Sequence, residues 1–83
     1  MTDSYVAEAS LGAVLEEKGR MGQALGHYRT SLEINPDYPY GHFSMGLILL
    51  KIGMKSQGCD HLKEALDLHP DYQEARQVFE VCR

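Results

Sequence analysis

Four histidines and two cysteines are the side chains of this sequence best suited to bind a metal ion or to act as nucleophiles. No HxxxH, HExxH or CxxC spacing occurs among them, although such spacings would place ligands together on one helix or turn. Cys59 and His61 are two residues apart and would project from different faces of a helix. We therefore expect no metal site and no bound cofactor. The six residues are His27, His42, Cys59, His61, His69 and Cys82.

The two cysteines are too few for a framework of several disulfides. Reduced thiols in a cytoplasmic setting are the simplest interpretation. Cys59 lies among apolar residues of its segment, which favours a buried, inert thiol, whereas Cys82 near the C-terminus could oxidise between chains. The N-terminal residues show no secretory leader. The longest apolar run, residues 47–50, is far shorter than the roughly 20 residues of a membrane span, so we predict a cytoplasmic protein without a membrane partner.

The stretch from Gly19 to Gly26 is rich in glycine but lacks the GK[ST] ending of a phosphate-binding loop. We expect it to form a turn between helices, with small residues for packing. The acidic residues Glu16, Glu17 and Glu33 are expected on solvated helix faces. No arrangement typical of a Ser/His/Asp or Cys/His nucleophile is present. The sequence therefore predicts neither an enzyme nor a small-molecule substrate.

Composition indicates one ordinary folded domain spanning residues 1–83. Hydrophobic residues make up 43% and charged residues 24% of the chain, as in globular proteins. The net charge is −4 and the basic residues are scattered. Because nucleic-acid binding needs a basic face, we expect no nucleic-acid partner.

The chain repeats itself with a period of 34 residues. When the sequence is aligned with itself at this offset, 11 of 49 pairs are identical, whereas ordinary composition would give roughly 3. Each unit is predicted to form two helices. Gly19 and Gly53 are the expected stops of the first helices, and Pro36 and Pro70 follow the ends of the second helices. Ser4 or Asp3 is the expected first cap.

Five helices are expected, and no segment alternates as a strand would. The expected helices cover residues 4–18, 21–34, 38–52, 56–68 and 72–83. We assign residues 5–38 to repeat one, 39–72 to repeat two, and 73–83 to a C-terminal capping or truncated helix.

The repeat resembles the tetratricopeptide repeat (TPR), whose signature is W-x2-L-G-x2-Y, then A-x3-F, then P. The departures are Glu8 and His42 in place of tryptophan, and Gly58 in place of alanine. The resemblance implies an all-α fold of antiparallel helix pairs in a short right-handed superhelix, with Gly12 and Gly46 at close helix approaches. The matching residues are Leu11, Gly12, Leu15, Ala24, Tyr28, Pro36, Met45, Gly46, Leu49, Gly58, Leu62, Ala65 and Pro70.

An apolar stripe at helical spacing is expected to form the core. In the second unit it comprises Met45, Ile48, Leu49 and Ile52, and in the first Leu11, Val14, Leu15 and Lys18. We expect this stripe to pack on the second helix of each unit.

A second stripe lies on another face of the first helices. The resemblance implies that it lines a concave groove that holds a peptide or helix of another protein. An alternative is packing between repeats, or a self-association seam of a scaffold fragment from a longer array. The Lys, Asn and Arg set with which some family members bind carboxylates is absent. The predicted lining residues are Val6, Ala9, Ala13, Tyr40, Phe43, Leu47, Leu50, Lys51 and Gln77.

Overall fold

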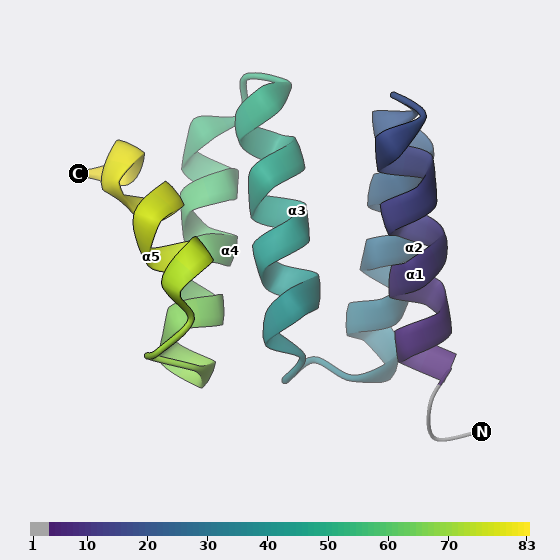
Figure 1. The fold of residues 1–83 in the computed structure, drawn as a ribbon, viewed down its shortest axis with the longest axis horizontal. Coiled ribbons are helices and arrows are strands. Elements are labelled where there is room, and N and C mark those ends of the chain that lie inside the picture. The colour runs from purple at the N-terminus through teal and green to yellow at the C-terminus, as the bar shows by residue number, and fades with distance from the viewer. Residues whose placement is uncertain (1–3) are drawn as a thin grey trace. The chain divides into compact units, whose positions relative to one another are not determined.

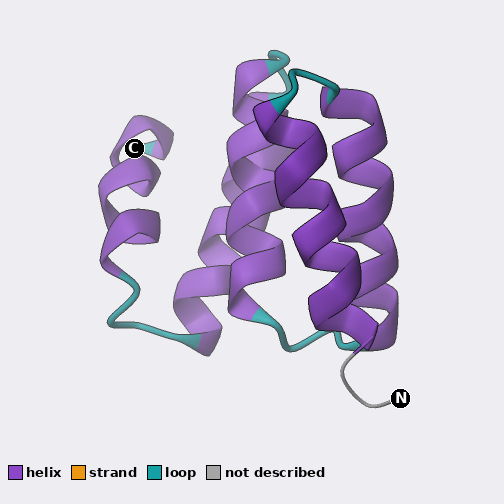
Figure 2. Cartoon of the chain, turned by 45° about the vertical axis from the view of Figure 1, so that its right-hand side comes forward, coloured by secondary structure: helices purple, strands orange, loops and turns teal. Residues whose placement is uncertain are grey.

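The computed structural model describes residues 4–83, and within this range the chain forms only helices and their connections (Figures 1 and 2). The chain divides into two compact units between Asp37 and Tyr38. The first unit contains α1 and α2, and the second contains α3, α4, α5 and the 3-10 helix η1. The bounds are α1 Ser4–Glu17, α2 Met21–Ile34, α3 Pro39–Lys51, α4 Lys55–Leu68, α5 Gln73–Phe79 and η1 Glu80–Cys82.

The observed helices follow the expected ones closely, and their ends have clear causes. Gly19 and Gly53 have φ angles of +79° and +89°, which L side chains rarely adopt. After α3, the Met54 amide donates to the Leu49 carbonyl at 2.8 Å, and the Gly53 amide donates to that of Leu50 at 3.1 Å. This pattern ends a helix at a left-handed glycine. Ser4 is the first residue of α1, and Asp3 lies outside the described residues.

In the first unit, α1 and α2 meet through a narrow seam. Tyr28 is fully buried, and its ring lies where a β-carbon on Gly12 would come within 3.0 Å. The Tyr28 hydroxyl donates to Glu16 Oε1 at 3.2 Å. The Ser31 hydroxyl donates to the Tyr5 carbonyl at 2.7 Å. Because Tyr5, Gly12 and Glu16 recur at helical spacing, one face of α1 makes all these contacts.

The second unit repeats this seam with a closer backbone approach. A β-carbon on Gly46 would lie 2.8 Å from Leu62 Cγ and 2.9 Å from the Gly58 carbonyl oxygen. A β-carbon on Gly58 would lie 2.9 Å from the Gly46 carbonyl oxygen and 3.1 Å from Leu50 Cγ. The close approach expected at Gly12 and Gly46 is therefore present in both helix pairs.

The predicted core stripe is misplaced in the first unit. Leu11 and Val14 are 50% and 49% exposed, although they were expected to pack on α2. Leu11 precedes Gly12 by one residue and therefore points about 100° away from the seam with α2. Its repeat equivalent Met45 has the same register and is buried, so helix register alone does not decide burial at this position. In the second unit Met45, Ile48 and Leu49 are buried, but Ile52 is 46% exposed.

Two smaller expectations for the first unit also need correction. Gly22 and Gly26 do not serve packing, because a β-carbon at either position would meet nothing within 4 Å. Glu16 is half-buried and accepts the Tyr28 hydrogen bond instead of only facing solvent. Glu17 and Glu33 are exposed, as expected.

Cys59 and Cys82 form a disulfide, which corrects the expectation of two free thiols. The bond joins the middle of α4 to η1 across 23 residues of sequence. Since Cys82 is paired within its own chain, it is not available for oxidation between chains. The sequence could not reveal this pair because it depends on α5 folding back along α4.

The two kinds of glycine predict opposite effects for the same substitution. Gly46→Ala should lower the free energy of unfolding by about 1–3 kcal/mol, since the added carbon overlaps backbone and side chain of α4. Gly26→Ala should raise it by up to about 1 kcal/mol, because the site is open and alanine favours helix. Chemical denaturation of both variants measures this. Equal effects would show that the seam is placed on the wrong face.

Removing the disulfide should weaken the second unit. Reduction of the wild type should lower the free energy of unfolding by about 2–4 kcal/mol, because the unfolded chain regains the freedom of the closed loop. Thermal melts with and without a reductant measure the change. Cys82→Ser is the control, since its melting should not respond to the reductant. Two reactive thiols per chain in the unreduced wild type would contradict the pairing.

Candidate functional site

Apolar side chains of α3 extend beyond the face that packs on α4. Gly46 marks the seam, and Tyr40, Phe43 and Leu47 lie about 60–120° around the helix from it. All three are partly exposed, with Tyr40 at 36%. We call these three residues the α3 stripe. An apolar stripe that lies near solvent is a surface suited to apolar contacts.

The structure separates the other predicted lining residues into several environments. Leu50 belongs to the seam, where its Cγ faces Gly58. Lys51 ends α3 and is exposed, and Gln77 is exposed on α5. The α1 residues belong to the first unit, where Val6 is exposed, Ala13 is half-buried and Ala9 is only 1% exposed.

An aromatic cluster that the sequence analysis missed adjoins the α3 stripe. The Tyr72 ring lies 5.0 Å from the Phe43 ring and 5.5 Å from the His69 ring, measured between centroids. The ring centroids of Tyr38 and Tyr40 are 6.0 Å apart. Tyr38 and Tyr72 are repeat equivalents, and they directly precede α3 and α5, respectively. This equivalence was the available signal, but the proximity of Tyr72 to Phe43 depends on how α5 packs.

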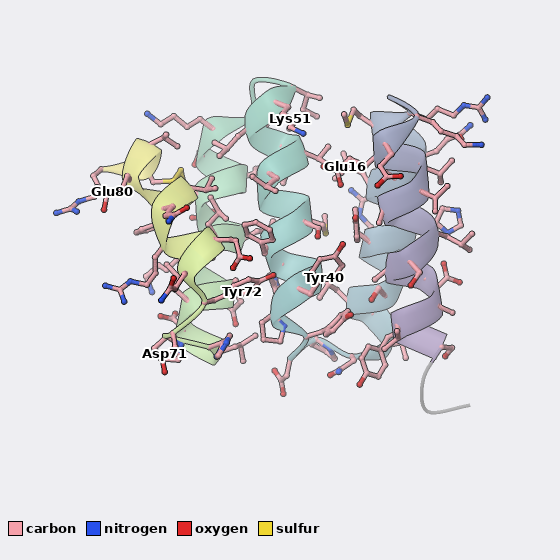
Figure 3. The ribbon with its side chains drawn as sticks, viewed as in Figure 1. Glu16, Tyr40, Lys51, Asp71, Tyr72 and Glu80 are labelled. Carbon is pink, nitrogen blue, oxygen red and sulfur yellow. A yellow bond between two sulfur atoms is a disulfide. The ribbon has the colours of Figure 1, made fainter. Side chains whose placement is uncertain are left out.

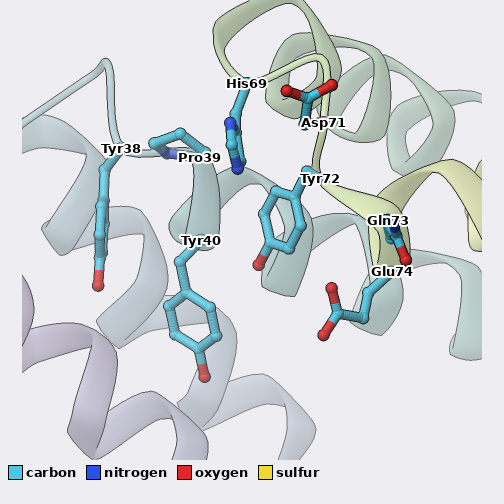
Figure 4. Close-up of a pocket in the computed structure, with 8 residues that line it drawn as sticks. All are labelled: Tyr38, Pro39, Tyr40, His69, Asp71, Tyr72, Gln73 and Glu74. Carbon is cyan, nitrogen blue, oxygen red and sulfur yellow. The ribbon is translucent and has the colours of Figure 1, made fainter.

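These aromatic residues line a cavity of about 560 Å³ within the second unit (Figure 4). Tyr40 projects from the first turn of α3 and Tyr72 from the connection before α5 (Figure 3). In the close-up, the Glu74 carboxylate extends toward the side of the Tyr40 and Tyr72 rings, while that of Asp71 points away. The lining residues are Tyr38, Pro39, Tyr40, His69, Asp71, Tyr72, Gln73 and Glu74.

Burial and nearby charge keep the Tyr72 phenol protonated. The pKa of Tyr72 is raised from 10.0 to about 12. Partial burial is the largest cause, followed by the negative charge of Glu74 and then by Tyr40 and Tyr38. At neutral pH the side chain is therefore a neutral ring with a hydroxyl that can donate or accept a hydrogen bond.

Three of the four histidines, His27, His42 and His61, take part in the helix seams. His27 Nδ1 lies 2.8 Å from Glu8 Oε1 in the first unit. At the equivalent place in the second unit, His42 Nδ1 lies 3.2 Å from His61 Nδ1, so that one ring donates and the other accepts. Residues 4–83 contain no group of three or more His, Cys, Asp or Glu side chains arranged to hold a metal ion.

The Tyr72 environment predicts an alkaline loss of stability. Tyrosine in the unfolded chain ionises near pH 10, whereas native Tyr72 holds its proton to about pH 12. The unfolded state therefore binds fewer protons in this interval, and the free energy of unfolding falls as the pH rises. Tyr72→Phe should show a shallower fall, and its ultraviolet titration should lack a component with a midpoint near 12. Identical profiles would refute this assignment.

Comparison with known proteins supports the repeat architecture. The family description "TPR repeat" matches residues 12–53, which is about half of the chain. No curated protein matches the sequence in a similarity search. Among the described residues, no helix is long and apolar enough to cross a membrane. TPR repeats are typically non-catalytic modules of protein interaction. The matched segment extends through α2 and includes both close-approach glycines, Gly12 and Gly46. With two helix pairs, each packed at an equivalent glycine, this chain belongs to the tetratricopeptide repeat family.

Proposed function

We propose that this chain is a protein–protein interaction module, without catalytic activity, that binds a peptide or helix of a partner through the α3 stripe. The observation that carries the proposal is the partial exposure of Tyr40, Phe43 and Leu47, while α4 occupies only the Gly46 face of the same helix. We propose Lys51 and Gln77 at the rim of this surface, and Val6 and Ala13 of the first unit as further partner contacts.

The chemistry of the α3 stripe supports a partner with apolar side chains. Aromatic residues contribute strongly to protein interfaces because they bury a large area with few rotatable bonds. Tyr40 and Phe43 offer such rings, and the contact of Phe43 with Tyr72 restricts its ring before any partner binds. A restricted ring loses less conformational entropy on binding.

A second candidate function is self-association, or assembly within a longer repeat array. It is favoured by Leu11 and Val14, which are half-exposed on α1 while their repeat equivalents Met45 and Ile48 are buried. A second copy or a preceding repeat could cover this α1 face, which is distinct from the α3 stripe.

The cytoplasmic location stays a prediction with less support than the sequence provided. Part of its basis was two reduced thiols, whereas the structure pairs Cys59 with Cys82. Disulfides persist mainly in oxidising compartments. Fractionation of cells that produce the protein, with thiols trapped at lysis, would determine the compartment and the redox state together.

A matched pair of variants tests the proposed surface. Leu47→Glu places a carboxylate on the α3 stripe, and Leu11→Glu makes the same change on the other exposed apolar face. We expect Leu47→Glu to retain helicity and to weaken partner binding by about tenfold or more, since a carboxylate in an apolar interface loses its hydration. Leu11→Glu should bind the partner as the wild type does. The measurement combines circular dichroism with quantitative affinity capture and mass spectrometry.

The other outcomes of this pair are also informative. Loss of helicity in Leu47→Glu would show that the α3 stripe is internal packing and would contradict the proposal. Retained capture by a folded Leu47→Glu would contradict it as well. If sedimentation shows a wild type heavier than a monomer and only Leu11→Glu is monomeric, the α1 face is a self-association seam.

A further inference from the structure

The cavity beside the α3 stripe has the chemistry of a site for a positively charged group. Three tyrosine rings line it, from Tyr38, Tyr40 and Tyr72, together with the His69 imidazole. The faces of aromatic rings carry negative electrostatic potential and attract ammonium and guanidinium groups. Three phenol rings around one space provide several such faces.

The charges of the lining residues have one sign. Asp71 and Glu74 are the acidic residues of the lining, and no lysine or arginine takes part in it. Both carboxylates are exposed, and the ion pairs present in residues 4–83 do not involve Glu74. Arg76 follows Glu74 by two residues and lines a different cavity with Leu66 and Phe79. A bound cation would therefore find Glu74 available for a charge-assisted contact.

The protonation state of Tyr72 agrees with this chemistry. Burial is the main cause of its raised pKa, and the nearby Glu74 charge adds to it, so the ring lies in a region of negative potential. The phenol remains neutral and offers its ring face and its oxygen lone pairs. The cavity volume of about 560 Å³ is within the usual range of ligand sites, roughly 300–1,000 Å³, and leaves room for a long side chain.

We propose that this cavity receives an arginine or lysine side chain of the partner polypeptide, held between the Tyr40 and Tyr72 rings and paired with Glu74. The inference rests on the proposed function, because Tyr40 belongs both to the α3 stripe and to the cavity lining. A segment that covers the stripe therefore has a residue at the mouth of the cavity. Recognition then combines apolar contacts along α3 with one basic residue.

The test uses small probes and does not require the partner. The whole chain, labelled with ¹⁵N, is titrated with N-acetyl-arginine methylamide and, in parallel, with the lysine and citrulline amides. Citrulline has nearly the shape of arginine without its charge. The titrations are done at low salt and about pH 8, where imidazole groups are ordinarily neutral. We expect saturable shifts at the amides of Tyr40, Tyr72 and Glu74 with both basic probes, and binding of citrulline weaker by about fivefold or more.

Variants assign the effect to the cavity. Glu74→Gln should weaken binding of the arginine probe by about fivefold. Asp60→Asn, an equal charge change on an exposed part of α4, should leave binding of this probe unchanged. Tyr40→Leu should bind the arginine probe more weakly than Tyr40→Phe, because only the leucine variant lacks the aromatic face. Circular dichroism verifies that each variant is folded.

Three results would overturn the inference: equal binding of arginine and citrulline probes, shifts spread over the surface without saturation, or a folded Glu74→Gln that binds as the wild type does. These failures are distinct from failure of the proposed function. If the probes do not bind but partner capture still depends on Leu47, the module function stands and the cation site does not. If the probes bind at Glu74 and no partner depends on Leu47, the cation site stands and the function proposed for the α3 stripe does not.

Discussion

The close contact of α3 with α4 at Gly46 and Gly58 determines which side chains of α3 remain at the surface of the second unit. Each glycine lies where a β-carbon would come within 2.9 Å of the carbonyl oxygen of the other. The two backbones therefore touch, and the seam occupies a narrow face of α3. Wider side chains at these positions would spread the contact over neighbouring faces. Because the seam is narrow, Tyr40, Phe43 and Leu47 are left beside it, where they form a surface of their own.

The two units keep the same seam positions but fill them with different chemistry. In the first unit Tyr28 fills the space at Gly12 and bonds to Glu16, and His27 pairs with Glu8. In the second unit the equivalents are Leu62 at Gly46, Leu50 against Gly58, and His61 with His42. The Tyr28 ring is thus replaced by a Leu62 side chain, and the pair of Glu8 and His27 by two histidines. The repeat therefore conserves the places of contact within the chain, while each pair of helices adjusts its own side chains.

The contrast between repeated contact positions and differing side chains explains how far the sequence could predict the structure. Helix ends followed from local signals, such as glycine at the positive-φ positions 19 and 53, so the ends of the first four helices were predicted to within one residue. The last helix was predicted to reach residue 83, whereas α5 ends at Phe79 and a 3-10 helix follows it. The prediction of burial for Leu11 and Val14 was wrong because the same apolar spacing occurs at Met45 and Ile48, which are buried, and spacing alone does not show in which unit these positions are covered. The Cys59–Cys82 pair and the aromatic cavity were missed because both depend on the packing of α5, which no local pattern specifies.

The two sides of the cavity come from equivalent segments of successive repeats: residues 38–40 form one side and residues 69–74 the other. Glu74 is the repeat equivalent of Tyr40, which in turn corresponds to Val6 on α1. One position on successive first helices thus carries an apolar, an aromatic and an acidic side chain. Tyr72 and Glu74 flank the start of α5, and the chain beyond α5 is tied to α4 by the Cys59–Cys82 bond. Because α5 has only 7 residues and little helical stability of its own, the disulfide restrains the side of the cavity that carries the acid and one of its rings.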